Sequence, residues 1–312
     1  MIRMQRVATA AIAALFLVCN GARAAEAGWL QVRDQNPFAL GAGIPLLPEG
    51  PLQTNEWHLD AYMAESNSQL PSSDAHTRVT YAAETRESRI AFAYAFDDEW
   101  SARVSLGAFW IGAPQGDRGG RLGVRPPYVR VDHNGSTLFL LDTSHQGVAP
   151  LLADVTRTWS VSDETHLGIS ASSAIPLGDA RYLDDLGATS VALSAFGDWR
   201  VNESLQTGAR IGYLHLGGND VLPSLARSNV PFGNVYVRLP LWSGWHAALQ
   251  YDLHGALYRD APNFLDYAGV LSIGLTHALG ARAQLQLAIS EDVPIQHTQD
   301  VVLSVALRVH SK

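Results

Sequence analysis

The chain has 312 residues, of which 47% are hydrophobic, with a mean hydropathy of zero and a formal net charge of −8 at pH 7. No stretch of 18 consecutive apolar residues follows the N-terminal region, which excludes a bundle of membrane-spanning helices. The acidic balance argues against nucleic acid as a partner, because nucleic-acid binding depends on clustered positive charge.

The first 24 residues have the organisation of a secretory signal peptide. Arg3 and Arg6 precede an apolar core over 7–18, and Ala22-Arg23-Ala24 is a small-x-small cleavage site. We therefore predict a signal peptide over 1–24 and a single domain over 25–312. An uncleaved anchor helix is the alternative, although the apolar core is short for a membrane span. Cleavage removes the only cysteine, Cys19, and it removes three arginines but no acid, so the charge changes from −8 to −11.

From residue 56 onward, apolar and other side chains alternate along successive runs, which is the period of a β-strand. The weaker pair 127–133 and 136–141 flanks Asn134-Gly135, a strong hairpin signal. Other weak candidates are 37–46 and 151–160, and the weak runs are also compatible with loops or an internal plug. The clear runs are 56–64, 77–84, 88–96, 100–110, 165–175, 189–199, 203–214, 234–241, 245–257, 267–277, 281–290 and 300–309.

The connections between these runs alternate in length. Short turns occur at 97–99, 162–164, 201–203, 242–244 and 279–280, and longer Gly-, Pro-, Asp- and Asn-rich segments at 111–126, 142–150, 176–188, 215–233, 258–266 and 291–299. Outer-membrane barrels have short periplasmic turns and long external loops, whereas a soluble sandwich has no reason for this alternation. We predict an all-β transmembrane antiparallel β-barrel of about 14 strands, within a range of 12–16.

Tryptophans gather beside the short turns. Indole prefers the boundary between membrane and water, so we predict a periplasmic girdle there. The alternative is the ordinary preference of aromatic residues for strands. The predicted girdle consists of Trp100, Trp159, Trp199, Trp242 and Trp245, and an outer girdle of Trp110, Tyr213, Tyr258 and Tyr267 is expected at the opposite end.

Charged residues share one parity along the strands. An arginine facing lipid costs about 2–4 kcal/mol at mid-membrane, so this face is expected to point into the barrel. A soluble β-protein with the polar face outward is the alternative. Each inward charge either braces the wall or tunes a conduction path. The predicted lumen-lining residues are Arg78, Arg89, Arg103, Arg210, Arg238, Asp252, Arg282 and Arg308.

Signatures of catalysis are nearly absent from the sequence. No Gly-x-Ser-x-Gly elbow or His-Glu-x-x-His motif occurs, and no histidine forms an evident ligand pair with a nearby acid, so we predict no catalytic residue, no metal site and no cofactor. Ser170 and His166 share a parity and are a weak hydrolase candidate. Loop acids at 291–292 and 300, and at 179 and 184–185, are interpreted as solvated, with calcium binding as the alternative.

Several short motifs, in this order and spacing, resemble a proteobacterial family known as domain of unknown function 3187. The motifs are Asn36-Pro37-Phe38, Pro176-Leu177-Gly178-Asp179, Leu257-Tyr258-Arg259-Asp260, Ser290-Glu291-Asp292 and Asp300-Val301. The resemblance covers nearly the whole mature chain, most convincingly over 176–309. It implies an exported Gram-negative outer-membrane barrel and supplies no activity or catalytic residue.

Taken together, the sequence predicts an integral outer-membrane barrel, structural or porin-like, with a polar lumen for small solutes and no enzymatic activity. Its expected partners are outer-membrane lipid and the barrel-assembly machinery. The chain ends in Val309-His310-Ser311-Lys312 rather than in the aromatic residue usual for that machinery. The alternatives are an outer-membrane lipid or lipopolysaccharide hydrolase and a soluble periplasmic β-protein that binds a partner.

Overall fold

The computed structural model describes residues 29–45, 52–113, 127–242, 244–293 and 301–311, so the predicted signal peptide lies outside the described residues. All described strands belong to one antiparallel sheet. They are β1 (Trp57–Ser73), β2 (Thr77–Ala95), β3 (Trp100–Gly112), β4 (Tyr128–His133), β5 (Ser136–Leu141), β6 (His145–Ser162), β7 (Thr165–Ile175), β8 (Ser190–Asn202), β9 (Leu205–Leu216), β10 (Asn229–Pro240), β11 (Trp245–His254), β12 (Ala268–Ala278), β13 (Ala283–Asp292) and β14 (Val301–His310).

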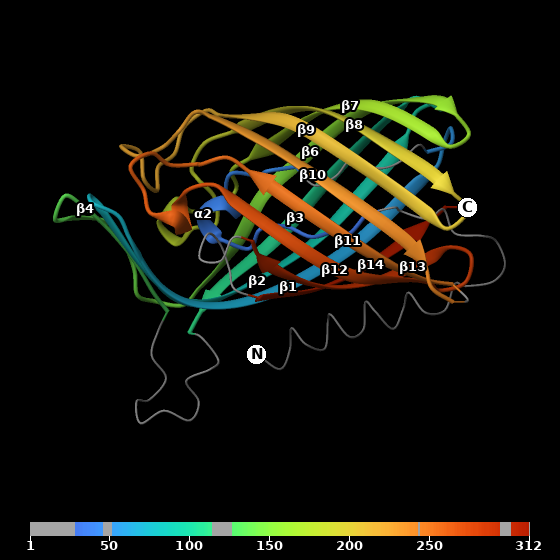
Figure 1. Ribbon diagram of the computed structural model, residues 1–312. Coiled ribbons are helices and arrows are strands. Elements are labelled where there is room, and N and C mark those ends of the chain that lie inside the picture. Colours follow the sequence, from blue (N-terminus) through green and yellow to red (C-terminus); the bar gives the residue numbers. More distant parts are fainter. Residues whose placement is uncertain (1–28, 46–51, 114–126, 243, 294–300, 312) are drawn as a thin grey trace.

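The sheet closes into a barrel because β1 pairs with both β14 and β2. Twelve strands form this ring, and the hairpin β4–β5 stands outside it, attached through β4 to residues 77–82 of β2. Figure 1 shows the hairpin protruding beyond one end of the barrel. The predicted closed antiparallel barrel is confirmed, and twelve wall strands fall within the expected range of 12–16. The turns that join β2 to β3, β6 to β7, β8 to β9, β10 to β11 and β12 to β13 lie at the other end, which we call the short-turn end.

Two predicted strand runs, 77–84 and 88–96, are one continuous strand, β2. The sequence pattern divides them into separate runs, but Thr85, Arg86 and Glu87 between them pair with β1 and β3 without interruption. Similarly, β6 begins at His145, inside a segment expected to be a loop. Polar residues at these positions report only that one face of the sheet is polar, not that the strand ends.

The weak strand candidate over 37–46 is wrong for residues 37–45, and its alternative, a loop or internal plug, is what forms there. Pro37–Leu40 forms the short helix α2, with Pro37 in its first turn and the side chain of Asn36 accepting a hydrogen bond from the Phe38 N–H. Asparagine as N-cap and proline in the first turn are standard helix-start signals. The remaining helical turns described are η2 (Ala180–Tyr182) and η3 (Asn263–Leu265). Among the residues described, no helix has the length and apolar character needed to cross a membrane.

The two faces of the wall differ sharply in composition. Large apolar side chains on the outer face are exposed, as illustrated by Ile90 at 63% and Ile211 at 72%. The inner face carries buried polar, charged and small residues, including Asp60, Arg89 and Gln250. This arrangement inverts the usual rule for soluble proteins and is typical of barrels whose outer surface contacts hydrocarbon.

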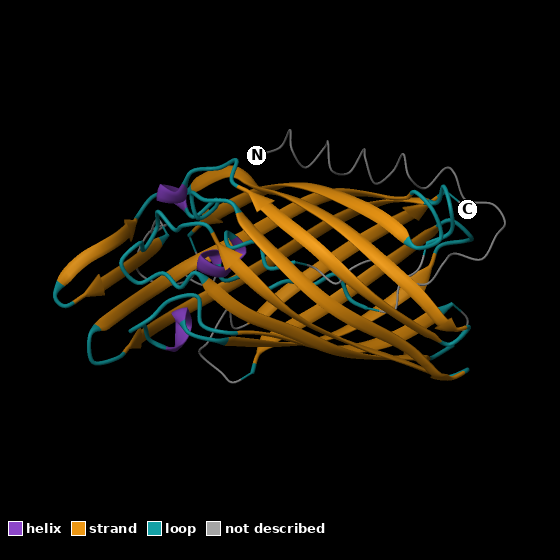
Figure 2. Ribbon diagram, turned by 90° about the horizontal axis from the view of Figure 1, so that it is seen from above, coloured by secondary structure: helices purple, strands orange, loops and turns teal. Residues whose placement is uncertain are grey.

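Residues 29–45 run through the interior of the barrel and fill it as a plug. Their contacts reach inward-facing residues on β2, β8, β11 and β13, strands distributed around the ring. Helix α2 lies near the end of the barrel from which the β4–β5 hairpin protrudes, as the two perpendicular views show (Figures 1 and 2). The interior is therefore occupied by the chain's own N-terminal segment.

Candidate functional site

Wall glutamines hold the first part of the plug by its backbone. The Leu30 N–H donates to Oε1 of Gln250 at 2.9 Å and the Gln31 N–H to Oε1 of Gln286 at 2.6 Å, while Nε2 of Gln286 donates to the Trp29 carbonyl at 3.1 Å. The indole of Trp29 meets the Tyr236 ring edge-on at 5.8 Å. An extended segment cannot satisfy its own backbone groups, so these amides replace the partners that a sheet or water would otherwise supply.

Glu87 is the charged centre of the contact between plug and wall. Its carboxylate, 1% exposed, accepts from the plug's Arg33 (NH1–Oε1 3.3 Å) and Gln35 (Nε2–Oε2 3.1 Å) and from Arg89 of its own strand (Nε–Oε1 2.5 Å). Two guanidinium groups therefore share one buried carboxylate. A buried charge is tolerated only when it is paired and hydrogen-bonded in this way, so the plug's position and the wall's charge depend on each other.

Farther along the plug, aromatic packing is added to polar contacts such as the hydrogen bond from Asn36 Nδ2 to the Phe264 carbonyl at 2.7 Å. The Phe38 ring makes edge-to-face contacts with Phe139, Tyr258 and Phe264 at centroid distances of 5.8, 6.2 and 6.4 Å. These rings belong to the largest apolar cluster among the described residues. Gly43 follows with φ of 69°, and a Cβ there would lie 2.1 Å from Cβ of Ala174, so only glycine allows this close approach to β7.

Near the short-turn end, ion pairs and hydrogen bonds connect the wall strands to one another. Asp60 of β1 accepts from Arg308 of β14 through both carboxylate oxygens, at 2.6 and 3.0 Å, and from NH2 of Arg103 of β3 at 3.3 Å. Farther around the ring, Asp198 accepts from the Tyr236 hydroxyl and from Gln206. These contacts join neighbouring and near-neighbouring strands across the inner face.

Most predicted lumen residues lie on the inner face, with two exceptions. Arg89, Arg103, Arg210, Arg238 and Arg308 are buried there, and half-buried Asp252 accepts from Nε2 of Gln250 at 2.8 Å. Arg78 and Arg282 are exposed, so their predicted inward placement is wrong. Arg78 was predicted to lie on the inner face because 77–84 was predicted as a separate short strand. In the continuous strand β2, Arg78 and Arg89 lie on opposite faces. Arg282 lies in the turn before β13.

The five tryptophans predicted to form a girdle lie at the short-turn end. Trp100, Trp199 and Trp242 are exposed and Trp159 and Trp245 half-buried; Trp245 also stacks on His277 with ring centroids 4.3 Å apart. Trp57, at the start of β1, joins them and was missed because no turn marks that position. Tyr258, assigned to an outer girdle, is instead only 1% exposed and packs against the plug.

The weak hydrolase candidate is not assembled. His166 contacts Oγ of Ser160 at 3.0 Å, and Ser170 accepts from Thr156. Four residues along an extended strand separate Ser170 from His166 by about 13 Å.

The acidic loop is braced by internal hydrogen bonds. Asp179 pairs with Arg181, Asp184 with His145, and Asp185 accepts from the Gly178 N–H. Asp300 lies outside the described residues. Asp184 and Asp185 are 4% and 1% exposed, so the interpretation of these two acids as solvated is wrong.

One group of metal-ligating side chains was overlooked. The sequence showed no histidine paired with an acid, yet the structure brings Glu56, His58 and His310 together. The signal available was Glu56-x-His58, two residues apart and therefore on one face of a strand. His310 is 252 positions away in sequence and joins them only because the barrel closes β1 onto β14.

No family model and no curated protein sequence matches this chain, so the resemblance to domain of unknown function 3187 stays a prediction. Solved structures do match. The COG4313 outer membrane channel from Pseudomonas putida F1 is 12% identical with a TM-score of 0.59, over 83% of this chain and 96% of that one. The NanC porin is 12% identical with a TM-score of 0.52, over 80% of this chain and 98% of that one. The chain shares the β-barrel fold of these two structures. At this identity the likeness concerns the fold alone.

Proposed function

We propose that this protein is an integral outer-membrane channel for small polar solutes, held closed by its own N-terminal segment. The exposed apolar outer face and the ring of tryptophans at the short-turn end support a position in the membrane, with that end in the periplasm. The likeness to outer-membrane channels in fold points the same way. An exported chain with a signal peptide over 1–24 would reach this membrane through the barrel-assembly machinery.

The observation that carries the proposal is the chemistry of the contact between plug and wall. The inner wall presents buried amide and carboxylate groups, and the plug satisfies them through Leu30, Gln31, Arg33 and Gln35. When the plug leaves, water and polar solutes take over these hydrogen bonds, so the wall is suited to a wet lumen. An apolar solute would leave the same groups unsatisfied.

The test compares the full mature chain with a variant lacking residues 25–45, both refolded in detergent and inserted into planar lipid bilayers. We expect rare, brief openings for the full chain and sustained conductance for the deletion variant. Heat-modifiable migration on a gel establishes that both barrels are folded. A folded deletion variant that does not conduct contradicts the channel and favours a structural barrel. A purified protein that stays folded and dissolved without detergent contradicts the membrane location.

A further inference from the structure

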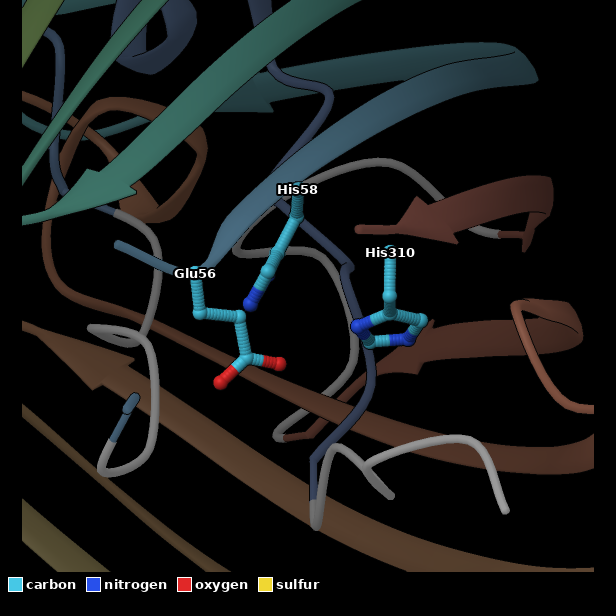
Figure 3. A group of neighbouring side chains, drawn as sticks. All are labelled: Glu56, His58 and His310. Carbon is cyan, nitrogen blue, oxygen red and sulfur yellow. The ribbon is translucent and has the colours of Figure 1, made fainter. Parts of the chain in front are cut away.

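Three buried side chains with metal-binding atoms converge where the first strand meets the last. Glu56 immediately precedes β1, His58 lies near the start of β1, and His310 ends β14. Their exposed fractions are 5%, 2% and 2%. One potential ligand atom from each lies within 4.8 Å of the other two, and Figure 3 shows the carboxylate and the two imidazoles directed toward the same region.

The sheet fixes the positions from which these side chains project. His58 and His310 are direct partners in the β1–β14 register. The backbone on both sides is paired, since the Ser311 N–H donates to the Trp57 carbonyl at 3.0 Å and the Ala95 N–H donates to the Glu56 carbonyl at 2.9 Å. Residues 56 and 58 share one face of their strand, so all three side chains enter the barrel at one level.

We propose that Glu56, His58 and His310 bind one divalent transition-metal ion, with zinc the best match. Two imidazoles and one carboxylate, with water in the fourth position, form a familiar tetrahedral zinc site. Zinc–nitrogen bonds of about 2.0–2.1 Å place tetrahedral ligand atoms about 3.3 Å apart. Binding would shorten the present separations of up to 4.8 Å to that value.

The surroundings of the three side chains suit such an ion. The Gln53 N–H donates to Oε2 of Glu56 at 2.9 Å and so orients the carboxylate, as second-shell groups do in metal sites. On β2 the buried inward-facing residues beside the pair are small, Ala93 and Ala95. On β13 the register positions of the same face beside His310 hold Arg282, which is exposed, and Gln284, which is buried.

The next layer of the lumen predicts which metals are selected. Two residues farther along β1, Asp60 forms ion pairs with the guanidinium groups of Arg308 and Arg103. This positive excess opposes cations that are held mainly by charge and by oxygen ligands, such as calcium and magnesium. Imidazole nitrogen favours zinc and its transition-metal neighbours instead. A bound ion would link β1 to β14 and so fasten the seam that closes the barrel, whether or not the lumen conducts.

The test is a zinc titration of untagged, EDTA-treated full mature chain refolded in detergent, with binding followed by calorimetry. We expect one zinc ion per chain, no response to calcium or magnesium, and a higher unfolding temperature with zinc. Loss of a supporting group weakens metal binding by about 10–100-fold, so loss of a direct ligand in His58→Gln or His310→Gln should weaken it by about 100-fold or more. Cobalt bound in the wild-type chain should show the strong visible absorption of a tetrahedral site.

His246→Gln is the matched control, because His246 also projects from the inner-face register near the short-turn end and, within the described chain, belongs to no such group of three. It should bind zinc as the wild type does. Folding of each variant is checked by heat-modifiable migration. Absence of zinc binding by the folded wild type overturns the site, as does unchanged affinity in folded His310→Gln. If neither histidine variant folds, the cobalt spectrum decides: an octahedral spectrum or none overturns the proposal.

Discussion

Different interactions stabilise the two ends of the lumen: apolar packing at one end and ion pairs at the other. Toward the end that carries the β4–β5 hairpin, α2 of the plug packs Phe38 against Tyr258 and Phe264, with no charge involved. Toward the short-turn end, Asp60 and its two arginines, Arg103 and Arg308, connect three wall strands. We therefore expect two separate effects. The apolar contacts of Phe38 retain the plug, and the ion pairs of Asp60 stabilise the ring of wall strands.

Glu87 and Asp60 can be compared directly because each forms ion pairs with two arginines. Glu87 shares its carboxylate between the plug and the wall, whereas both arginines paired with Asp60 belong to the wall. The ion pair between Arg33 and Glu87 is broken when the plug leaves. The ion pairs of Asp60 with Arg308 and Arg103 persist with or without the plug. Substitutions at these two acids should therefore change different measurements.

Asp60→Asn is expected to have the largest effect. It leaves the buried guanidinium groups of Arg103 and Arg308 without their carboxylate, a change that typically costs about 3–5 kcal/mol. Urea unfolding in detergent micelles, followed by tryptophan fluorescence, should show this loss, and conductance of the folded fraction should stay low. Asp132→Asn in β4, whose partner Arg130 is exposed, is the control and should cost less than about 1 kcal/mol. Equal stability of the two variants would contradict the structural role of Asp60.

Phe38→Ala should release the plug while leaving the barrel folded. Truncation of a buried phenylalanine costs about 3–5 kcal/mol, and here that cost falls on the docking of α2 rather than on strand pairing. Bilayer recordings should show a higher fraction of time in the open state, with the heat-modifiable gel shift unchanged. Phe92→Ala, on the outer face and 49% exposed, is the matched control and should not change conductance. A Phe38→Ala barrel that remains closed would show that apolar packing does not retain the plug.

Glu87→Gln should act on the plug more than on the wall. After the substitution Arg89 keeps the Pro150 carbonyl at 3.0 Å, and Arg33 keeps the Ile44 carbonyl at 3.3 Å. Because both arginines retain an acceptor, we expect a cost of about 1–3 kcal/mol, smaller than for Asp60→Asn. The same recordings should show more frequent openings, and addition of Arg33→Met should produce little further change. Additive effects of the two substitutions would indicate that Arg33 and Glu87 do not act together.

The sequence was sufficient for the wall because a strand's alternation is local. Ala288, Ile289 and Ser290 reveal their faces without knowledge of any partner, and the signal is repeated in every strand. Continuity of strands was harder to predict, since Arg86 and Glu87 look like turn residues until β1 and β3 are seen to pair with them. Arg78 was misplaced for this reason.

An internal plug was one alternative for 37–46, but the contacts of the plug and the histidine cluster were beyond reach for a different reason. Gln250 and Gln286 receive their role from Leu30 and Gln31, more than 200 positions away, and a single sequence does not show that pairing. The helix-start signal of Asn36-Pro37 was present, but the apolar residues around it also fit a strand. His310 likewise acquires its neighbours only when the ring closes.

The smallest effect is expected in the loop between β7 and β8, outside the barrel wall. Hydrogen bonds from the side chain and backbone N–H of Arg181 lower the pKa of Asp179 from its ordinary value of 3.8 to about 2. A lowered pKa means that the folded loop favours the carboxylate, so its stabilisation is complete above about pH 4 and is lost as the pH falls toward 2. NMR titration of the Asp179 carboxyl carbon should give a midpoint near 2, returning toward 3.8 in Arg181→Gln. Because the Arg181 side chain is 81% exposed and the pair spans only two residues, the stability of the barrel should not change in Arg181→Gln. An NMR midpoint near 3.8 in the unmodified chain would mean that the pair between Asp179 and Arg181 does not persist in water.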